Sequence, residues 1–165
     1  MGKKLVIGAS GQIGVELIDK LALQHGVEQV IATDIKPQPD IYKDGVKSYK
    51  LDVLDKVKLF DIIKDNDVSE VYLLAALLSA VSENKIQSAW DLNMNGLFNI
   101  LELAREKHIK QVFWPSSIAV FGPTSPKDQT PQNTFLEPLT VYGISKMAGE
   151  RWCEYYFKKF GVDVR

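Results

Sequence analysis

Cysteine and histidine are scarce in this 165-residue sequence, which contains only Cys153, His25 and His108 of these two types. A single cysteine excludes a disulfide within the chain and a metal site built from several cysteines. The two histidines stand near the ends of helical patterns without other ligand residues at metal-binding spacing, so we expect no metal site. We interpret Cys153, which falls inside a predicted helix, as a packed and unreactive thiol.

An excess of charge and a long apolar run are absent as well. The 20 basic and 21 acidic residues give a net charge of -1, without the basic excess typical of nucleic-acid-binding proteins. The longest apolar run, residues 71–81, is too short to span a bilayer. A strand expected from Lys3 onward leaves no space for a signal peptide, and Val6 replaces the Ser or Thr of a myristoylation motif. We therefore expect a soluble protein of the reducing cytoplasm, with neither nucleic acid nor membrane as a partner.

Short apolar runs alternate with helical patterns along the whole chain. The runs predict strands at 3–8, 29–33, 48–51, 71–74 and 111–114, and the start of a sixth at 162–165. Helical periodicity follows Gly14 and returns at 54–65, 88–107 and 142–161. This alternation is typical of the α/β class with a doubly wound parallel sheet, the Rossmann architecture. We expect one cofactor-binding domain over 1–165, truncated before a C-terminal substrate-binding part.

A glycine-rich loop, Gly8-x-x-Gly11-x-x-Gly14, lies between the first predicted strand and the first predicted helix. A tight turn at this point brings the backbone close to a pyrophosphate at the helix N-terminus. We expect Gln12 and Ile13, which open the helix, to share in cofactor binding. Glycines that merely form a turn are the alternative, but the succession of strand, loop, helix, strand and acid favours a dinucleotide site.

The acidic residue of that succession is Asp34, which stands twenty residues after Gly14 at the end of the second predicted strand. A carboxylate there accepts hydrogen bonds from the adenosine ribose and repels a 2′-phosphate. Because the next residue, Ile35, is not basic, the sequence favours NAD over NADP. The alternative is that Asp34 only caps a turn before Pro37.

The ends of the third and fourth predicted strands supply four further candidates. We expect Asp52 and Val53 to contact the edge and face of the adenine. Ala75 and Ala76 are small enough to leave room for the ribose and nicotinamide, although plain packing explains these alanines equally well.

Tyr142 and Lys146 are four residues apart in the last predicted helix, so their side chains share one face. A phenol has a pKa near 10 and is a poor base at neutral pH, but an adjacent cation favours the phenolate. Tyr142 is therefore a candidate general base. Tyr155 and Lys159 repeat the spacing roughly 20 Å further along the helix, and we interpret that pair as coincidental.

A serine after the fifth predicted strand would complete the catalytic group. Ser117 lies twenty-five residues before Tyr142, and both should emerge at the carboxyl edge of the sheet. Its hydroxyl is suited to hold a substrate oxygen beside the phenol. Ser116 is the competing candidate, and turn formation explains either serine.

The chain resembles the extended short-chain dehydrogenase/reductase family over essentially its whole length. The resemblance is carried by the glycine loop, Asp34, Ser117, Tyr142 and Lys146, which occur in the order and at the spacing of that family. The resemblance implies that Tyr142 is the catalytic base and that Ser117 holds the substrate hydroxyl. It also implies that Lys146 favours the phenolate and binds the nicotinamide ribose. Asn93 matches an asparagine of this family whose role is structural or adjacent to the cofactor.

Within that family, residues 75–80, 114–127 and 142–150 look like the zinc-independent, epimerase-like type of L-threonine 3-dehydrogenase. This resemblance implies NAD-dependent oxidation of the threonine β-hydroxyl to 2-amino-3-oxobutyrate by a homodimer. It places Ser79 on a loop that reaches the amino-acid substrate. No pair of residues for the carboxylate and ammonium of threonine is visible in the sequence. We expect the dimer contact on the two long helices that start near Ser88 and Tyr142.

Two other functions stay open from the sequence alone. An NAD-dependent sugar-nucleotide 4-epimerase has the same fold and cofactor, and a non-catalytic NAD-binding fragment would keep the glycine loop without turnover. A 4,6-dehydratase is less favoured, because Ile118 and Ala119 stand where acidic residues are expected.

Overall fold

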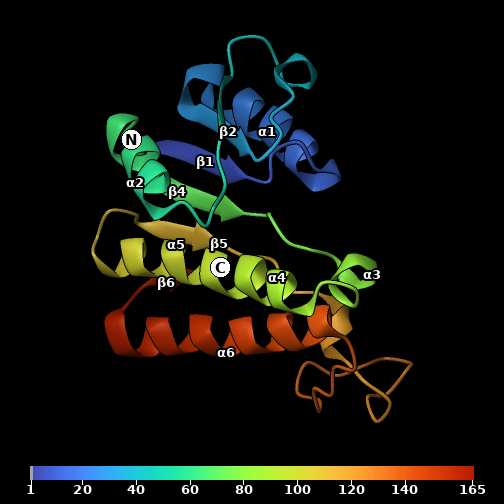
Figure 1. The fold of residues 1–165 in the computed structure, drawn as a ribbon. Helices are drawn as coiled ribbons and strands as arrows, with labels where there is room; N and C mark the ends of the chain where they lie inside the picture. The colour runs from blue at the N-terminus through green and yellow to red at the C-terminus, as the bar shows by residue number, and fades with distance from the viewer. Residues whose placement is uncertain (1) are drawn as a thin grey trace.

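Six parallel strands form one sheet at the centre of the computed structural model, which describes residues 2–165 (Figure 1). The strand order is β3-β2-β1-β4-β5-β6, the order of a dinucleotide-binding fold. The strands are β1 Lys3–Ile7, β2 Val30–Asp34, β3 Lys47–Lys50, β4 Val68–Leu73, β5 Gln111–Phe113 and β6 Asp163–Val164. The predicted parallel sheet is confirmed. β4 starts at Val68, earlier than predicted, because Ser69 and Glu70 interrupt its apolar run.

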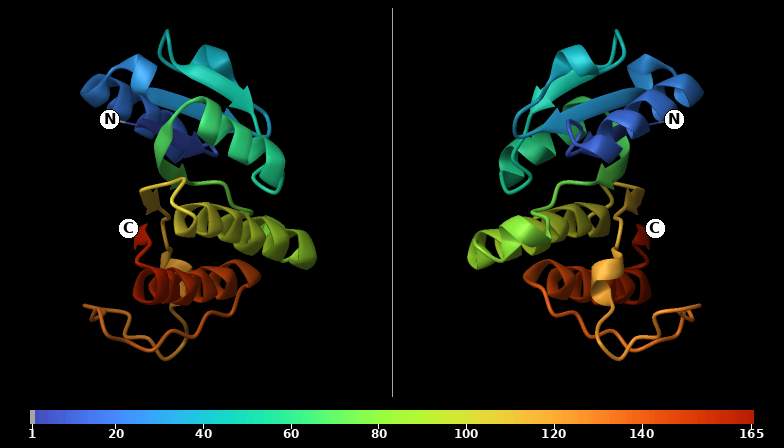
Figure 2. Two further views of the ribbon diagram at one scale, coloured as in Figure 1. Left: turned by 90° about the vertical axis from the view of Figure 1, so that its left-hand side faces the viewer. Right: turned by 90° about the vertical axis from the view of Figure 1, so that its right-hand side faces the viewer.

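Helices cover both faces of the sheet, so the doubly wound arrangement is also confirmed (Figure 2). α1 (Gln12–His25) packs on one face through Ile18, Leu21 and Ala22. The opposite face carries the larger core, under α2 (Lys56–Asp65), α5 (Gly96–Arg105) and α6 (Val141–Phe160). The strands are apolar on both faces where helices cover them, as expected of a parallel sheet.

The predicted helix at 88–107 runs from Ile86 to Arg105 and is interrupted by a wider turn. α4 (Ile86–Trp90) passes through the π-helical turn η3 (Asp91–Asn95) into α5. Such turns add one residue to the hydrogen-bonded ring and occur often at functional sites. Elements too short to give a periodic signal were not predicted: η1 (Val27–Gln29), η2 (Pro39–Ile41), α3 (Ser79–Ser82) and η4 (Ile118–Val120).

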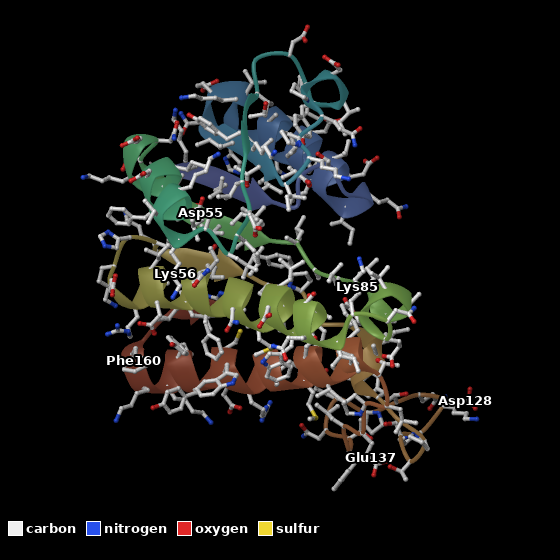
Figure 3. The ribbon with its side chains drawn as sticks, viewed as in Figure 1. Asp55, Lys56, Lys85, Asp128, Glu137 and Phe160 are labelled. Carbon is white, nitrogen blue, oxygen red and sulfur yellow. The ribbon has the colours of Figure 1, made fainter. Side chains whose placement is uncertain are left out.

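Side-chain caps fix where α2 and α6 begin. Asp55 accepts a hydrogen bond from the backbone N–H of Lys58 at 3.0 Å, at the start of α2 (Figure 3). Thr140 accepts one from the N–H of Gly143 at 3.0 Å, at the start of α6. α6 ends at Gly161, which adopts φ 68° in the left-handed region.

All five loops that carry predicted site residues follow the carboxyl ends of strands β1 to β5. Because the strands are parallel, these loops meet at one edge of the sheet, where open α/β sheets bind ligands. Within residues 2–165, no helix is both long enough and apolar enough to cross a membrane.

Candidate active site

The glycine loop forms a tight cradle between β1 and α1. Gly8 has φ 88°, and a Cβ there would lie 2.7 Å from the backbone nitrogen of Ala75. A Cβ on Gly14 would lie 2.5 Å from the carbonyl oxygen of Gly8. Both positions therefore require glycine, and the loop after β4 lies directly against the loop after β1. Gln12 and Ile13 open α1 with backbone N–H groups that have no partner inside the helix, an arrangement that fits a pyrophosphate.

The carboxylate of Asp34 reaches from β2 to the glycine loop. Its Oδ2 accepts a hydrogen bond from the backbone N–H of Ser10 at 3.0 Å, and its Oδ1 accepts one from that of Lys36 at 3.0 Å. The turn-capping role considered for Asp34 is therefore present. Each carboxylate oxygen can accept a further bond, so the group also fits the ribose of a dinucleotide.

The two candidates after β3 differ in their exposure. Asp52 is exposed and accepts a hydrogen bond from the N–H of Leu54 at 3.0 Å. Val53 has a side chain that is 2% exposed and packs against Gly96 in the core. The chain turns this side chain inward as it leaves β3, and the contact of Val53 with the adenine stays a prediction. Only the backbone of Val53 stays available for such a contact.

Tyr142 and Lys146 share one face of α6, with the Lys146 Nζ 5.6 Å from the centroid of the Tyr142 ring. The ammonium donates a hydrogen bond to the carbonyl oxygen of Pro115 at 2.6 Å and lies 4.1 Å from the centroid of the Trp114 ring. Lys146 is 4% exposed, and burial lowers its pKa to about 8. The group is still mostly charged at neutral pH, but the fold holds that charge away from water.

The structure separates the two competing serines after β5. Ser116 donates a hydrogen bond to Glu150 of α6. Ser117 instead accepts one from the backbone N–H of Ala119 at 3.2 Å, as the cap of η4. The Ser117 hydroxyl therefore keeps its own proton for a further acceptor. η4 packs on the start of α6, since a Cβ on Gly143 would lie 2.2 Å from the Ala119 carbonyl oxygen. This brings the Ser117 turn next to Tyr142.

Asn93 ties the loop after β4 to α6. Its Oδ1 accepts a hydrogen bond from the backbone N–H of Leu77 at 2.9 Å. Its Nδ2 donates to the Leu77 carbonyl oxygen at 3.2 Å and to the Ser145 hydroxyl at 3.1 Å. The side chain is 4% exposed. These contacts give Asn93 a structural role, and its predicted place beside the cofactor stays a prediction. Ala75 and Ala76, on the same loop, are partly buried.

A cavity of about 500 Å³ opens beside the start of α6. Its lining brings Ser79, from the loop after β4, together with Ile118 and Ala119 of η4 and with Thr140. The rest of the lining comes from the proline-rich loop between η4 and α6: Phe121, Gly122, Pro123, Ser125, Pro126, Lys127, Thr130 and Leu139. Figure 3 shows two labelled members of this loop, Asp128 and Glu137, projecting beyond the helical layer. Among the described lining residues, Lys127 is the one that carries a charge.

Four residues of this region were not singled out from the sequence. Thr140 carries a readable signal, because a threonine directly before a helical pattern predicts an N-cap. The contact of Trp114 with Lys146 had no such signal, since it depends on how α6 crosses β5. Gly149 permits that crossing, because a Cβ there would lie 2.3 Å from the Trp114 ring. Lys127 had no signal in the sequence either, because its position at the cavity depends on the path of the long loop between η4 and α6.

The residues set aside from the sequence lie outside the site. Tyr155 and Lys159 are exposed near the end of α6. Cys153 is half-buried, and burial raises the pKa of its thiol to about 12, which agrees with the unreactive thiol that we expected. No cluster of three or more metal-ligating side chains occurs in the part of the chain that the structure describes.

Comparison with known proteins gives one family. Residues 4–165 match the NAD dependent epimerase/dehydratase family. A protein of Staphylococcus epidermidis named as an uncharacterized epimerase/dehydratase is 48% identical over the entire chain, which covers 52% of that relative. The chain therefore spans about half the length of the curated relatives that it matches.

Solved structures give a narrower set of similar proteins. A GalE-like L-threonine dehydrogenase from Cupriavidus necator in its holo form is 50% identical with a TM-score of 0.95, covering 99% of this chain and 52% of that one. A monomeric L-threonine 3-dehydrogenase from a metagenome is 46% identical with a TM-score of 0.92, covering 98% and 51%. A UDP-glucose 4-epimerase from Thermotoga maritima is 23% identical with a TM-score of 0.89 over 98% of this chain and 53% of that one. That last likeness shows the fold alone.

Replacing Lys146 by methionine is expected to stabilise the cofactor-free fold at neutral pH. A lysine pKa lowered from 10.5 to about 8 corresponds to a folding penalty of about 3 kcal/mol for the ammonium. Loss of the hydrogen bond to Pro115 costs about 1 kcal/mol. The free energy of unfolding, measured by urea denaturation, should therefore rise by about 2 kcal/mol.

The stability difference between Lys146→Met and its parent should depend on pH. Between about 8 and 10.5 the unfolded lysine binds a proton that the folded one has released, so the parent protein gains stability as pH rises through this range. Lys146→Met lacks this gain, and its advantage should disappear at the upper end. Lys159→Met, at an exposed lysine of the same helix, is the control and should change stability by less than about 0.5 kcal/mol. A Lys146→Met protein less stable than its parent at neutral pH would contradict a desolvated charge.

Proposed function

We propose that this chain, which belongs to the NAD dependent epimerase/dehydratase family, is the NAD-binding domain, residues 1–165, of a zinc-independent L-threonine 3-dehydrogenase. The proposed reaction oxidises the β-hydroxyl of L-threonine to give 2-amino-3-oxobutyrate, with hydride transfer to NAD. The observation that carries the proposal is the 50% identity and TM-score of 0.95 to an L-threonine dehydrogenase across 99% of this chain.

Family membership confirms two predictions made from the sequence. The extended short-chain dehydrogenase/reductase resemblance is confirmed by the match over residues 4–165, and so is the expectation of an NAD-dependent enzyme. The glycine cradle and the Asp34 carboxylate are the groups of this chain that would hold the dinucleotide.

The residues around the start of α6 suit the proposed oxidation. Tyr142 takes the proton from the β-hydroxyl as general base, with the Lys146 ammonium 5.6 Å from the centroid of its ring. The Ser117 hydroxyl, which keeps its own proton, donates to the same substrate oxygen and orients it. A bound NAD would supply the acceptor for the hydride from C3. The substrate thus loses one proton and one hydride, which balances its oxidation to the ketone.

The cavity beside α6 supports an amino-acid substrate. Ile118 and Ala119 of η4 line it with Ser79 and Thr140. Ser117 directly precedes Ile118, and Tyr142 lies two residues after Thr140, although neither lines the cavity itself. Lys127, the one charged residue of the described lining, is positive and so is a candidate partner for a carboxylate. The sequence alone offered no partner for the threonine carboxylate, and the path of the proline-rich loop supplies this candidate.

Replacing Tyr142 by phenylalanine tests the catalytic assignment in the whole enzyme that contains this chain. Loss of a general base should lower kcat for L-threonine by a factor of about 100 to 10,000, followed by the absorbance of NADH. Tyr155→Phe, at the same spacing from a lysine in the same helix, is the control and should stay within about twofold of the parent. Equal activity of Tyr142→Phe and the parent would exclude this base. Conversion of UDP-galactose without oxidation of threonine would identify a sugar-nucleotide epimerase instead.

Replacing Lys127 by methionine tests the carboxylate assignment. A hydrogen bond to a charged group contributes about 1.5–3 kcal/mol, so KM for L-threonine should rise by a factor of about 10 to 100 while kcat changes little. The amino alcohol 1-aminopropan-2-ol, which lacks the carboxylate, should be oxidised equally by the variant and the parent. Lys56→Met, on α2 at the far side of the molecule (Figure 3), is the matched control. An unchanged KM for threonine in Lys127→Met would remove Lys127 from substrate recognition.

We also propose a homodimer in the cytoplasm, with the contact on the outer surface of α4 and α6. Exposed apolar side chains gather there: Trp90 is 40% exposed, Trp152 41%, Ile144 43% and Ile86 63%. Two of these are tryptophans, which are enriched at protein interfaces. Trp152 is held by an edge-to-face contact with Phe98 of α5, with ring centroids 5.0 Å apart. One similar enzyme is described as monomeric, so the state of this chain needs a direct test.

Replacing Trp152 by glutamate should convert the proposed dimer to a monomer, because the interface would then bury an unpaired carboxylate. Sedimentation velocity measures the change as a halving of the mass. Leu23→Glu is the control, since Leu23 is 69% exposed on α1, on the opposite side of the sheet. A parent protein that sediments as a monomer, or a Trp152→Glu protein that stays dimeric, would overturn this contact.

A further inference from the structure

Ser10 links the glycine loop to three residues of the segment after β2. Its backbone N–H donates to Asp34 Oδ2 at 3.0 Å. Its hydroxyl oxygen lies 2.7 Å from the hydroxyl of Tyr42 and 3.2 Å from the carbonyl oxygen of Lys36. The residues directly beside Ser10 are Ala9 and Gly11, whose side chains cannot form hydrogen bonds.

The direction of these hydrogen bonds follows from counting protons. A serine hydroxyl has one proton, and a carbonyl oxygen only accepts. The Ser10 proton therefore goes to Lys36, and the Tyr42 hydroxyl must donate its own proton to Ser10. The result is a directed chain of two hydrogen bonds, from Tyr42 through Ser10 to the backbone of Lys36.

Tyr42 has a fixed position at the start of this series of hydrogen bonds. It follows the turn η2, and it is 7% exposed in the core cluster that packs under α1 with Ile18 and Leu21. Burial of the ring determines the position of its hydroxyl, so the Ser10 hydroxyl meets a donor that does not need to be ordered on binding.

The same residues orient the carboxylate of Asp34. One carboxylate oxygen is held by the N–H of Ser10 and the other by the N–H of Lys36, both at 3.0 Å. These two donors belong to Ser10 and Lys36, which the hydrogen bond from the Ser10 hydroxyl to the Lys36 carbonyl oxygen also joins. A shift of Ser10 relative to Lys36 would therefore turn the carboxylate that faces the adenosine ribose.

We propose that Tyr42 is a positioning residue for the adenosine half of NAD. It acts through Ser10 and Lys36 by fixing the Asp34 carboxylate and the glycine loop in the geometry that accepts the ribose. This role concerns NAD binding only. It would therefore hold for any substrate that the protein oxidises.

The test is the affinity of the chain for NAD and for ADP-ribose, measured by calorimetry on Tyr42→Phe. This variant keeps the buried ring and removes only the hydroxyl. One hydrogen bond of this kind contributes about 0.5–1.5 kcal/mol, so both dissociation constants should rise by a factor of about 3 to 10. Tyr49→Phe is the matched control, because the Tyr49 hydroxyl donates to Asn66 at 2.9 Å away from the glycine loop. Its affinity for NAD should equal that of the parent.

A double-mutant cycle separates positioning from a general loss of stability. If Tyr42 acts through Ser10, then Tyr42→Phe combined with Ser10→Ala should bind NAD no more weakly than Ser10→Ala alone. Additive losses, an unchanged affinity of Tyr42→Phe, equal losses in Tyr49→Phe, or a parent chain that binds no NAD would each overturn the proposal. Threonine turnover is not a readout here, so failure of this proposal leaves the proposed substrate standing. Likewise, an enzyme that ignores threonine leaves the role of Tyr42 standing.

Discussion

The site depends on one buried positive charge. The Lys146 ammonium sits between the Pro115 carbonyl and the Trp114 ring, and it is 4% exposed. Burying a charge is unfavourable unless hydrogen bonds and a polarisable partner offset the loss of water. Gly149 supports this arrangement, because only a residue without a side chain lets α6 approach the Trp114 ring so closely. The end of β5 and the start of α6 are therefore built around a charge that packing alone would not favour.

Side-chain hydrogen bonds fix the two loops that flank the crevice at the carboxyl edge. At the end of β2, Asp34 accepts a hydrogen bond from the backbone N–H of Ser10, which connects the loop after β2 to the glycine loop. After β4, Asn93 holds both backbone groups of Leu77 and also reaches Ser145. Hydrogen bonds within the protein thus hold both loops in place. A preordered site loses less conformational entropy on binding than a mobile one.

The sequence predicted the features that depend on local pattern and failed where side-chain direction depends on tertiary packing. Strand and helix periodicity predicted the sheet, and the glycine spacing predicted the cradle. Spacing could not choose between Ser116 and Ser117, because the choice depends on the contact of one serine with Glu150 of α6. It gave no sign that the Val53 side chain is buried, since nothing local indicates which way a residue turns after a strand. It also missed the π-helical turn, whose sequence has ordinary helical spacing.

The π-helical turn η3 constrains the number of residues in the helix from Ile86 to Arg105. An α-helix turns by about 100° per residue, so the one extra residue in η3 sets the phase between Asn93 and the apolar stripe of α5. With it, the amide faces α6 while Leu97 and Ile100 stay in the core. Deleting a single residue here would regularise the helix and yet rotate one of these two faces away from its partner. An insertion or deletion in this segment would therefore be more damaging than most substitutions on its exposed side.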